Sequence, residues 1–98
     1  MKVMKFGGTS VGSVNSILNL KGIVENAAKE ERVIVVVSAL GGVTDKLIKS
    51  ANMAVNGNEE FNREFQEIVT RHHELINAII PCDEKRSALL QEIGRAHV

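Results

Sequence analysis

The residues best suited to chemistry lie near the start of the chain, where Lys5–Ser10 reads KFGGTS. The glycines have no Cβ, so their backbone N–H groups can approach an anion closely and can adopt positive φ. Thr9 and Ser10 offer hydroxyl donors, and Lys5 supplies a compact positive charge. A helix expected from about Ser13 would direct its positive N-terminal end towards the same place. These residue types predict a phosphate site.

The same segment is also compatible with a purely structural role. A glycine pair after a strand often forms only a tight turn, and a lysine in a terminal strand is often a solvated edge residue. The segment is not a Walker A loop, because no Gly-Lys-Ser/Thr follows at the required spacing, and it is not the Gly-x-Gly-x-x-Gly dinucleotide motif. By itself it leaves both interpretations open.

A second loop of glycine and hydroxyl residues, Ser38–Asp45 (SALGGVTD), follows a second apolar segment. Strands are expected at Val3–Phe6 and Val33–Val37, with a helix over about Ser13–Lys29 between them. The unbroken β-branched run Val33–Val37 is typical of a parallel strand buried on both faces. The βαβ unit should have a right-handed crossover, and both loops should leave one carboxyl edge, where ligands of open α/β sheets bind.

The rest of the sequence predicts three helices. The first stops at Asn56-Gly57, a good C-cap pair, and its expected inward residues are Leu47, Ile48, Ala51, Ala54 and Val55. A long helix over about Glu59–Ile79 follows, and its expected buried residues are Phe61, Phe65, Ile68, Val69, Leu75, Ile76 and Ile79. Pro81 ends it, and Asp83 can start a last helix that holds Leu89 and Leu90.

Composition narrows the class of protein. The 98 residues suit one small α/β domain, and twelve basic side chains balance twelve acidic ones, so we expect no nucleic-acid partner. The longest apolar run, Val33–Val37, is too short to span a membrane, and no secretory signal is evident. A single cysteine, Cys82, cannot form an internal disulfide. Together these features predict a cytoplasmic protein.

The histidines predict no metal site. Neighbouring positions on a helix point about 100° apart, so His72 and His73 do not face one another, and a metal pair would need i, i+4 spacing and further ligands. The acidic residues of the long helix are expected to form a solvated face with a favourable first-turn charge. No Ser-His-Asp or Cys-His arrangement is evident in the sequence.

Taken together, the two loops resemble the signature motifs of aspartokinases, which belong to the amino-acid kinase superfamily. Lys5–Val11 is similar to the first motif and Ser38–Asp45 to the second, at the usual separation. Related kinases of glutamate, acetylglutamate, carbamate and UMP usually vary the Phe-Gly-Gly-Thr-Ser stretch. The early start, and the long helix beginning after Asn56-Gly57, look most like the bifunctional aspartokinase/homoserine dehydrogenase branch. The resemblance covers roughly residues 1–90.

The resemblance implies ATP-dependent phosphorylation, with Mg²⁺, of the β-carboxylate of L-aspartate. The product, 4-phospho-L-aspartate, opens the route to lysine, threonine and methionine. Lys5 would neutralise charge on the transferring phosphoryl group, and the amides of Gly7 and Gly8 would cradle phosphate oxygens beside Thr9 and Ser10. Phosphoryl transfer needs mainly positioning and charge stabilisation, which these groups can supply.

The second loop is implied to bind the acceptor. Ser38 and Thr44 would help seat the aspartate, while Gly41 and Gly42 shape the loop. Asp45 stands where asparagine is common in the family, and we assign it no role.

The resemblance also implies an incomplete fold, the N-terminal part of a parallel-rich sheet sandwiched by helices. An aspartokinase catalytic domain is more than twice as long as this chain, and its later loops supply the metal-phosphate aspartate, substrate-gripping residues and adenine pocket. We therefore expect Mg²⁺ to be held mainly by residues absent here. Residues 1–91 alone should be inactive, and the parent enzyme should be a homo-oligomer.

The last seven residues, Glu92–Val98 (EIGRAHV), fit no helix pattern set by the residues before them. From Ile93 onward they match, in frame, the translation of a common sequencing adapter, which then reaches a stop codon. We expect residues 92–98 to be a non-native tail, with native sequence ending near Gln91. The alternative is a natural exposed tail.

Two other functions are compatible with the sequence. One is a different amino-acid kinase with another acceptor, and the other is a non-catalytic phosphate-binding module that is complete at this length. A complete module should bury its apolar faces, whereas a partial domain should leave an apolar sheet face or edge exposed.

Overall fold

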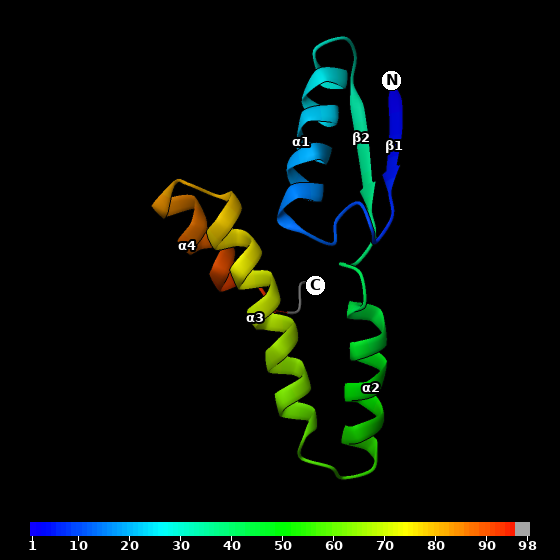
Figure 1. Ribbon diagram of the computed structural model, residues 1–98, viewed down its shortest axis with the longest axis vertical. Coiled ribbons are helices and arrows are strands. Elements are labelled where there is room, and N and C mark those ends of the chain that lie inside the picture. Colours follow the sequence, from blue (N-terminus) through cyan, green and yellow to red (C-terminus); the bar gives the residue numbers. More distant parts are fainter. Residues whose placement is uncertain (96–98) are drawn as a thin grey trace. The chain divides into compact units, whose positions relative to one another are not determined.

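The computed structural model describes residues 1–95 and has an α/β fold, as expected (Figure 1). Its elements are β1 (Lys2–Phe6), α1 (Val14–Ala28), β2 (Val33–Val37), α2 (Val43–Val55), α3 (Phe61–Ile79) and α4 (Asp83–Glu92). The chain divides into two units, Met1–Thr44 and Asp45–Val98, with the boundary in the first turn of α2. Residues 96–98 of the predicted tail lie outside the described residues.

In the first unit, β1 and β2 form a two-stranded parallel sheet, as the sequence predicts (Figure 1). The register runs from Lys2 opposite Val33 to Phe6 opposite Val37. At one end the Lys2 N–H donates to the Arg32 carbonyl at 2.8 Å, and at the other the Ser38 N–H donates to the Phe6 carbonyl at 3.0 Å. β1 begins one residue earlier than expected, and β2 has the expected bounds.

Helix α1 begins with a serine N-cap, whose hydroxyl accepts a hydrogen bond from a backbone N–H of the first turn. Ser13 is the N-cap in an extended conformation, and its Oγ accepts the Ser16 N–H at 3.2 Å. The Ser13 hydroxyl also donates to Ser16 Oγ at 2.9 Å. Capping of this kind stabilises a helix by about 1 kcal/mol. The observed bounds lie within the expected range of Ser13–Lys29.

The expectation that β2 is buried on both faces is wrong for this chain. The side chains of Ile34, Val35, Val36 and Val37 are 46%, 40%, 45% and 56% exposed. Met4 and Phe6 of β1 line hollows against α1, which places the helix over one face of the sheet. Within residues 1–95 the sheet has two strands, and Val3, Ile34 and Val36 on its other face are exposed.

In the second unit, ion pairs join α2 to α3. Lys46 Nζ lies 2.7 Å from Glu67 Oε2, and Lys49 Nζ lies 2.9 Å from Glu64 Oε1. The predicted inward face of α2 is therefore wrong, because the side towards α3 carries these lysines. The five residues expected to point inward are all exposed: Leu47, Ile48, Ala51, Ala54 and Val55. Gly57 follows α2 at φ +73°, as a helix-ending glycine requires.

Helix α3 buries less than its pattern predicts. Ile68 is 7% exposed, whereas Phe65 is 43% exposed, so its predicted burial is wrong. The other predicted members are half-buried: Phe61, Val69, Leu75, Ile76 and Ile79. Gly94, just after α4, lies against this helix, since a Cβ there would be 3.5 Å from the Phe65 ring. Of the predicted residues of α3, Ile68 alone is thus buried.

Helix α4 begins after Pro81, as predicted, and is attached to the end of α3 by Arg86. This guanidinium donates to the Ile80 carbonyl at 3.2 Å and pairs with Asp83. Leu90 is half-buried and Leu89 is exposed. Within residues 1–95, no helix has the length and apolar character needed to cross a membrane.

Candidate functional site

The two glycine loops make contact through their backbones. A Cβ at Gly8 would lie 3.4 Å from the Ala39 carbonyl oxygen and 3.5 Å from Gly41 Cα. A Cβ at Gly41 would lie 3.4 Å from the Gly8 carbonyl oxygen. A methyl group at Gly8 or Gly41 would thus already be in van der Waals contact with the backbone of the other loop. The parallel sheet therefore brings the loops after β1 and β2 together, as predicted.

Tight turns give each loop its shape. The Ser10 N–H donates to the Gly7 carbonyl at 3.0 Å, and the Val43 N–H donates to the Leu40 carbonyl at 3.0 Å. Gly42 has φ +83°, a conformation that requires glycine in practice. Neither Gly7 nor Gly8 has positive φ. The first glycine pair thus contributes close approach and space, without the left-handed conformation that the sequence made available to it.

Sequence reasoning missed Gly12. A Cβ at Gly12 would lie 3.1 Å from the Gly8 carbonyl oxygen, a tighter approach than at Gly8 or Gly41. Two valines of the first unit are buried, Val11 at 7% exposure and Val43 at 4%. Gly12 directly precedes the N-cap serine of α1 and belongs to no periodic pattern of residues. Nothing in the sequence therefore distinguishes it from an ordinary turn glycine.

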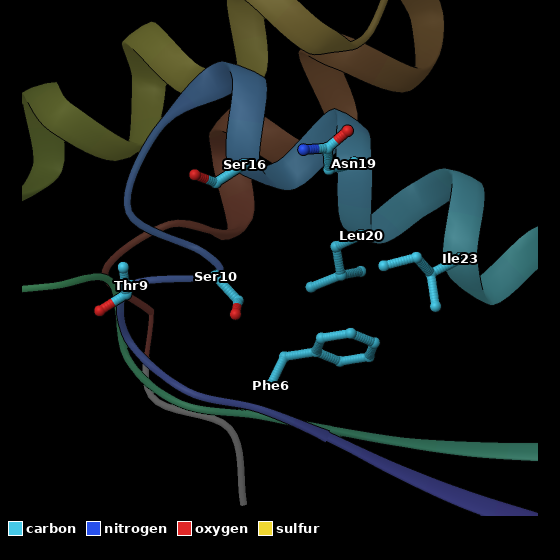
Figure 2. A pocket seen from close by; sticks show the side chains of 7 residues that line it. All are labelled: Phe6, Thr9, Ser10, Ser16, Asn19, Leu20 and Ile23. Carbon is cyan, nitrogen blue, oxygen red and sulfur yellow. The ribbon is translucent and has the colours of Figure 1, made fainter.

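A hollow of about 300 Å³ lies beside the first loop (Figure 2). It is lined by Phe6, Thr9 and Ser10, and by Ser16, Asn19, Leu20 and Ile23 of α1. Figure 2 shows the Phe6 ring facing Leu20 and Ile23, whereas hydroxyl and amide groups occupy the other side. The predicted residues Thr9 and Ser10 thus belong to a hollow with one polar and one apolar side.

The α1 residues of this hollow were not predicted as site residues. Their positions 16, 19, 20 and 23 share one helix face, and this i, i+3, i+4 spacing was the available signal. The polar members, Ser16 and Asn19, share this face with the apolar Leu20 and Ile23. In the sequence they resemble ordinary polar helix positions.

Lys5 lies on the other face of the sheet. Successive side chains alternate across a strand, so Lys5 projects opposite to its neighbours Met4 and Phe6, which face α1. It pairs in register with Val36 and is exposed. Within residues 1–95 its ammonium makes no ion pair. Lys5 is therefore not among the residues that line the hollow with Thr9 and Ser10.

The predicted residues of the second loop are accessible. Ser38 directly follows β2, where its N–H extends the ladder, and its side chain is exposed. Thr44 is exposed in the first turn of α2. Both are thus available to a ligand at the carboxyl end of β2.

Within residues 1–95, no cluster of metal ligands is found at the glycine loops. In the described part of the chain, no three His, Cys, Asp or Glu residues form a group that could hold a metal ion. In the second unit, the ion pair between α2 and α3 shifts two pKa values. The hydrogen bond from Lys46, followed by its charge, lowers the pKa of Glu67, and the same hydrogen bond raises the pKa of Lys46.

His72 has a local structural role. Its Nδ1 lies 2.7 Å from the Ile68 carbonyl oxygen, one helical turn earlier. The ring is half-buried on α3. The contact ties the imidazole to the backbone of its own helix, which is a structural role.

The first unit is an α/β unit whose glycine loops meet at the carboxyl edge of parallel strands, the place where proteins of this class bind ligands. Comparison with known families makes the assignment specific. Residues 1–96 match the amino acid kinase family, and the chain belongs to this family.

Relatives with known names are aspartokinases. The chain is 52% identical over 50 residues to the aspartokinase of Bacillus sp. (strain MGA3). The aligned segment covers 50% of this chain and 12% of the relative. It is 40% identical over 70 residues to the aspartokinase of Helicobacter pylori (strain ATCC 700392 / 26695), and this segment covers 69% of this chain and 16% of the relative. It is 32% identical over 59 residues to the bifunctional aspartokinase/homoserine dehydrogenase of Buchnera aphidicola subsp. Acyrthosiphon pisum (strain APS), covering 60% and 7%. The matched part thus spans less than a fifth of each relative.

Proposed function

We propose that this chain is the N-terminal part of an ATP-dependent kinase that phosphorylates L-aspartate to 4-phospho-L-aspartate. The observation that carries the proposal is the approach of the two loops, in which Gly8 lies against Ala39 and Gly41. A kinase must hold a phosphoryl donor and its acceptor side by side, and two converging loops provide this arrangement. The names of the relatives support aspartate as the acceptor.

The first loop would hold the phosphates of ATP. The N–H groups of Gly7 and Gly8 would donate to phosphate oxygens, with the hydroxyls of Thr9 and Ser10 nearby. Nothing lies within 4 Å of a Cβ at Gly7, so a ligand has space to approach the backbone there. Lys5, exposed and without an ion pair in the described chain, would offset charge on the transferring group.

The second loop would hold the acceptor. Ser38 and Thr44 would bind the aspartate, and Gly41 and Gly42 would give the loop its shape. A β-carboxylate oxygen would form a bond to the γ-phosphorus as the bond from that phosphorus to the ADP oxygen breaks. Because this chemistry needs no covalent protein intermediate, positioning and charge are the main contributions required.

Several parts of this function would come from residues outside this chain. Bound Mg²⁺ would neutralise phosphate charge, and its ligands would lie mainly beyond this chain. We also propose a homo-oligomeric parent enzyme with a homoserine dehydrogenase half, for which the bifunctional Buchnera relative is the support. The exposed face and edge of the sheet favour a partial domain over a phosphate-binding module complete at this length. The 98-residue chain alone should be inactive.

The test is a coupled ADP-release assay on the product of the complete source gene. We expect turnover with aspartate and none with glutamate, whereas a different amino-acid kinase would prefer another acceptor and a binding module would bind ATP without turnover. Lys5→Met should lower kcat by at least about 100-fold, since it removes charge stabilisation of the transition state. Lys2→Met, an exposed lysine on the same strand, is the control. Equal activity of the two variants would contradict the role of Lys5.

A further inference from the structure

One face of α3 carries only charged and polar side chains. A shallow hollow of about 330 Å³ runs along this face, and α3 alone lines it. Its lining positions follow the i, i+3, i+4 spacing of a single helix face: Arg63, Gln66, Glu67, Thr70, Arg71 and Glu74. Ile68, the buried residue of α3, points away from this face. The charged face is therefore separate from the side of α3 that packs inside the second unit.

The charges along the middle of this face are complementary to themselves when the helix is reversed. The middle line consists of Arg63, Glu67, Thr70 and Glu74, and the intervals between these positions are symmetric about their midpoint. A second α3 that runs antiparallel across that midpoint therefore places Arg63 opposite Glu74 at both ends. Between the ends, Glu67 lies opposite Thr70. The guanidinium can pair with the carboxylate of Glu74, and the threonine hydroxyl can donate to the carboxylate of Glu67.

We infer that this face of α3 docks the same face of a second copy of the chain, with the two helices antiparallel. The contact uses one surface on both copies, as a closed two-fold interface requires. Parallel pairing in register would place Arg63 opposite Arg63 and Glu74 opposite Glu74, and juxtaposed like charges are unfavourable. Charged positions on helix faces set partner choice and orientation in this way. Because the arginines and glutamates of the face balance, a strongly acidic or strongly basic partner fits it less well.

The chemistry of the face favours a second copy over the remainder of a larger domain. A domain core covers apolar surface, and arginine and glutamate are almost never fully buried unless they are paired. The side chains of Arg63 and Glu67 are 77% and 46% exposed, and Glu74 is exposed. Glu67 holds Lys46 through Oε2, and docking would leave that pair in place. A single helix face is a small interface, so we expect weak association that increases with protein concentration.

Charge reversal in the 98-residue chain tests the pairing. Arg63→Glu places two carboxylates together at each end of the contact, and Glu74→Arg places two guanidinium groups together. Each variant alone should self-associate at least about tenfold more weakly than the parent chain. An equimolar mixture of the two variants should associate as the parent does, because a mixed pair again has opposite charges at both ends. Sedimentation velocity over a series of concentrations measures both effects.

The controls make the same changes of net charge elsewhere. Lys85→Glu and Glu84→Arg alter exposed side chains of α4 and should leave the association unchanged. Circular dichroism verifies that each variant folds. A mixture that associates no better than its components would overturn the inference, as would equal weakening by the controls or a parent chain that is monomeric at every concentration.

Cross-linking decides the question if a charge variant fails to fold. In a Cys82→Ser background, Thr70→Cys places two thiols about 4.5 Å apart along the axes of the paired helices. A short bismaleimide should join two such chains at least about tenfold faster than chains with Ser87→Cys, which is exposed on α4. Equal rates contradict the inference, whatever the size of the products. The inference does not depend on kinase activity, so its failure and a failure of aspartate turnover are separate outcomes.

Discussion

The contacts inside the first unit of this chain differ in kind from the contacts inside the second. In Met1–Thr44 the decisive contacts join backbone to backbone, in the strand ladder and in the approach of Gly8 to Gly41. In Asp45–Val98 they join side chains, in the exposed ion pairs between α2 and α3 and around one buried isoleucine. The candidate site depends on the first kind. We therefore expect the first unit to lose stability when side-chain atoms are added at its glycines. The second unit should lose stability when side-chain atoms are removed from its core.

The largest effect should come from the core of the second unit. Ile68 is its buried apolar residue in the described chain, at 7% exposure, and Ile68→Ala should lower the free energy of unfolding by about 2–4 kcal/mol. Urea denaturation followed by circular dichroism measures this. Leu89→Ala on α4, where the side chain is exposed, is the control and should change stability far less. Similar losses at both positions would mean that this unit is not organised around Ile68.

The next effect tests the glycine contact of the first unit. Gly8→Val should lower the free energy of unfolding by about 1–3 kcal/mol, because its Cβ would already contact the backbone of the other loop and leave little room for the two methyl groups. Gly7→Val is the matched control, since nothing lies within 4 Å of a Cβ there. The same urea denaturation applies. If Gly7→Val costs as much, loss of glycine flexibility rather than loop contact explains the result.

Substituting a glycine that has no contact with another segment should stabilise the protein. Gly22 lies inside α1 with nothing within 4 Å of a Cβ, so Gly22→Ala should raise the free energy of unfolding by about 0.5–1 kcal/mol. Gly57→Ala should act in the opposite direction, because Gly57 has φ +73°. Thermal unfolding of both variants provides the comparison. A destabilised Gly22→Ala variant would show that α1 has neighbours that this structure lacks.

The smallest effect concerns pH and the α2–α3 ion pair. The pKa of Glu67 is lowered by the Lys46 hydrogen bond, so this stabilisation is present above its ordinary value of 4.5 and is lost as pH falls through the folded-state pKa. The raised pKa of Lys46 gives stabilisation that is present below 10.5 and lost as pH rises further. Glu67→Gln should therefore be slightly less stable than the parent at pH 7 and converge with it in acid. A difference that persists at pH 2, or is unaffected by salt, would contradict this origin.

Local structure was the most predictable part of the molecule. The β-branched run predicted β2 at its observed bounds, and Ser13 indicated the start of α1, because propensity and capping act over a few residues. The meeting of the loops also followed from the sequence, since parallel strands joined by one helix end at the same edge. The roles of Lys5, Ser38 and Thr44 stay predictions.

Burial was predicted less well. The apolar patterns of β2 and α2 predict burial, yet the structure leaves Val36 and Val55 exposed. A periodic pattern states which side of an element is apolar. Whether anything covers that side depends on partners that are distant in the chain or outside it.

The sequence by itself determined the element types, the parallel strand pair and the identity of the glycine loops, because these depend on residue type and short spacings. Only the tertiary structure decided that Gly12 and Gly41 both lie against Gly8, that Ser16 and Asn19 join Thr9 and Ser10 around one hollow, and that Lys5 lies on the opposite sheet face. The reason is geometric. Such contacts depend on how separate segments approach one another in space, and no single segment of the sequence contains that distance.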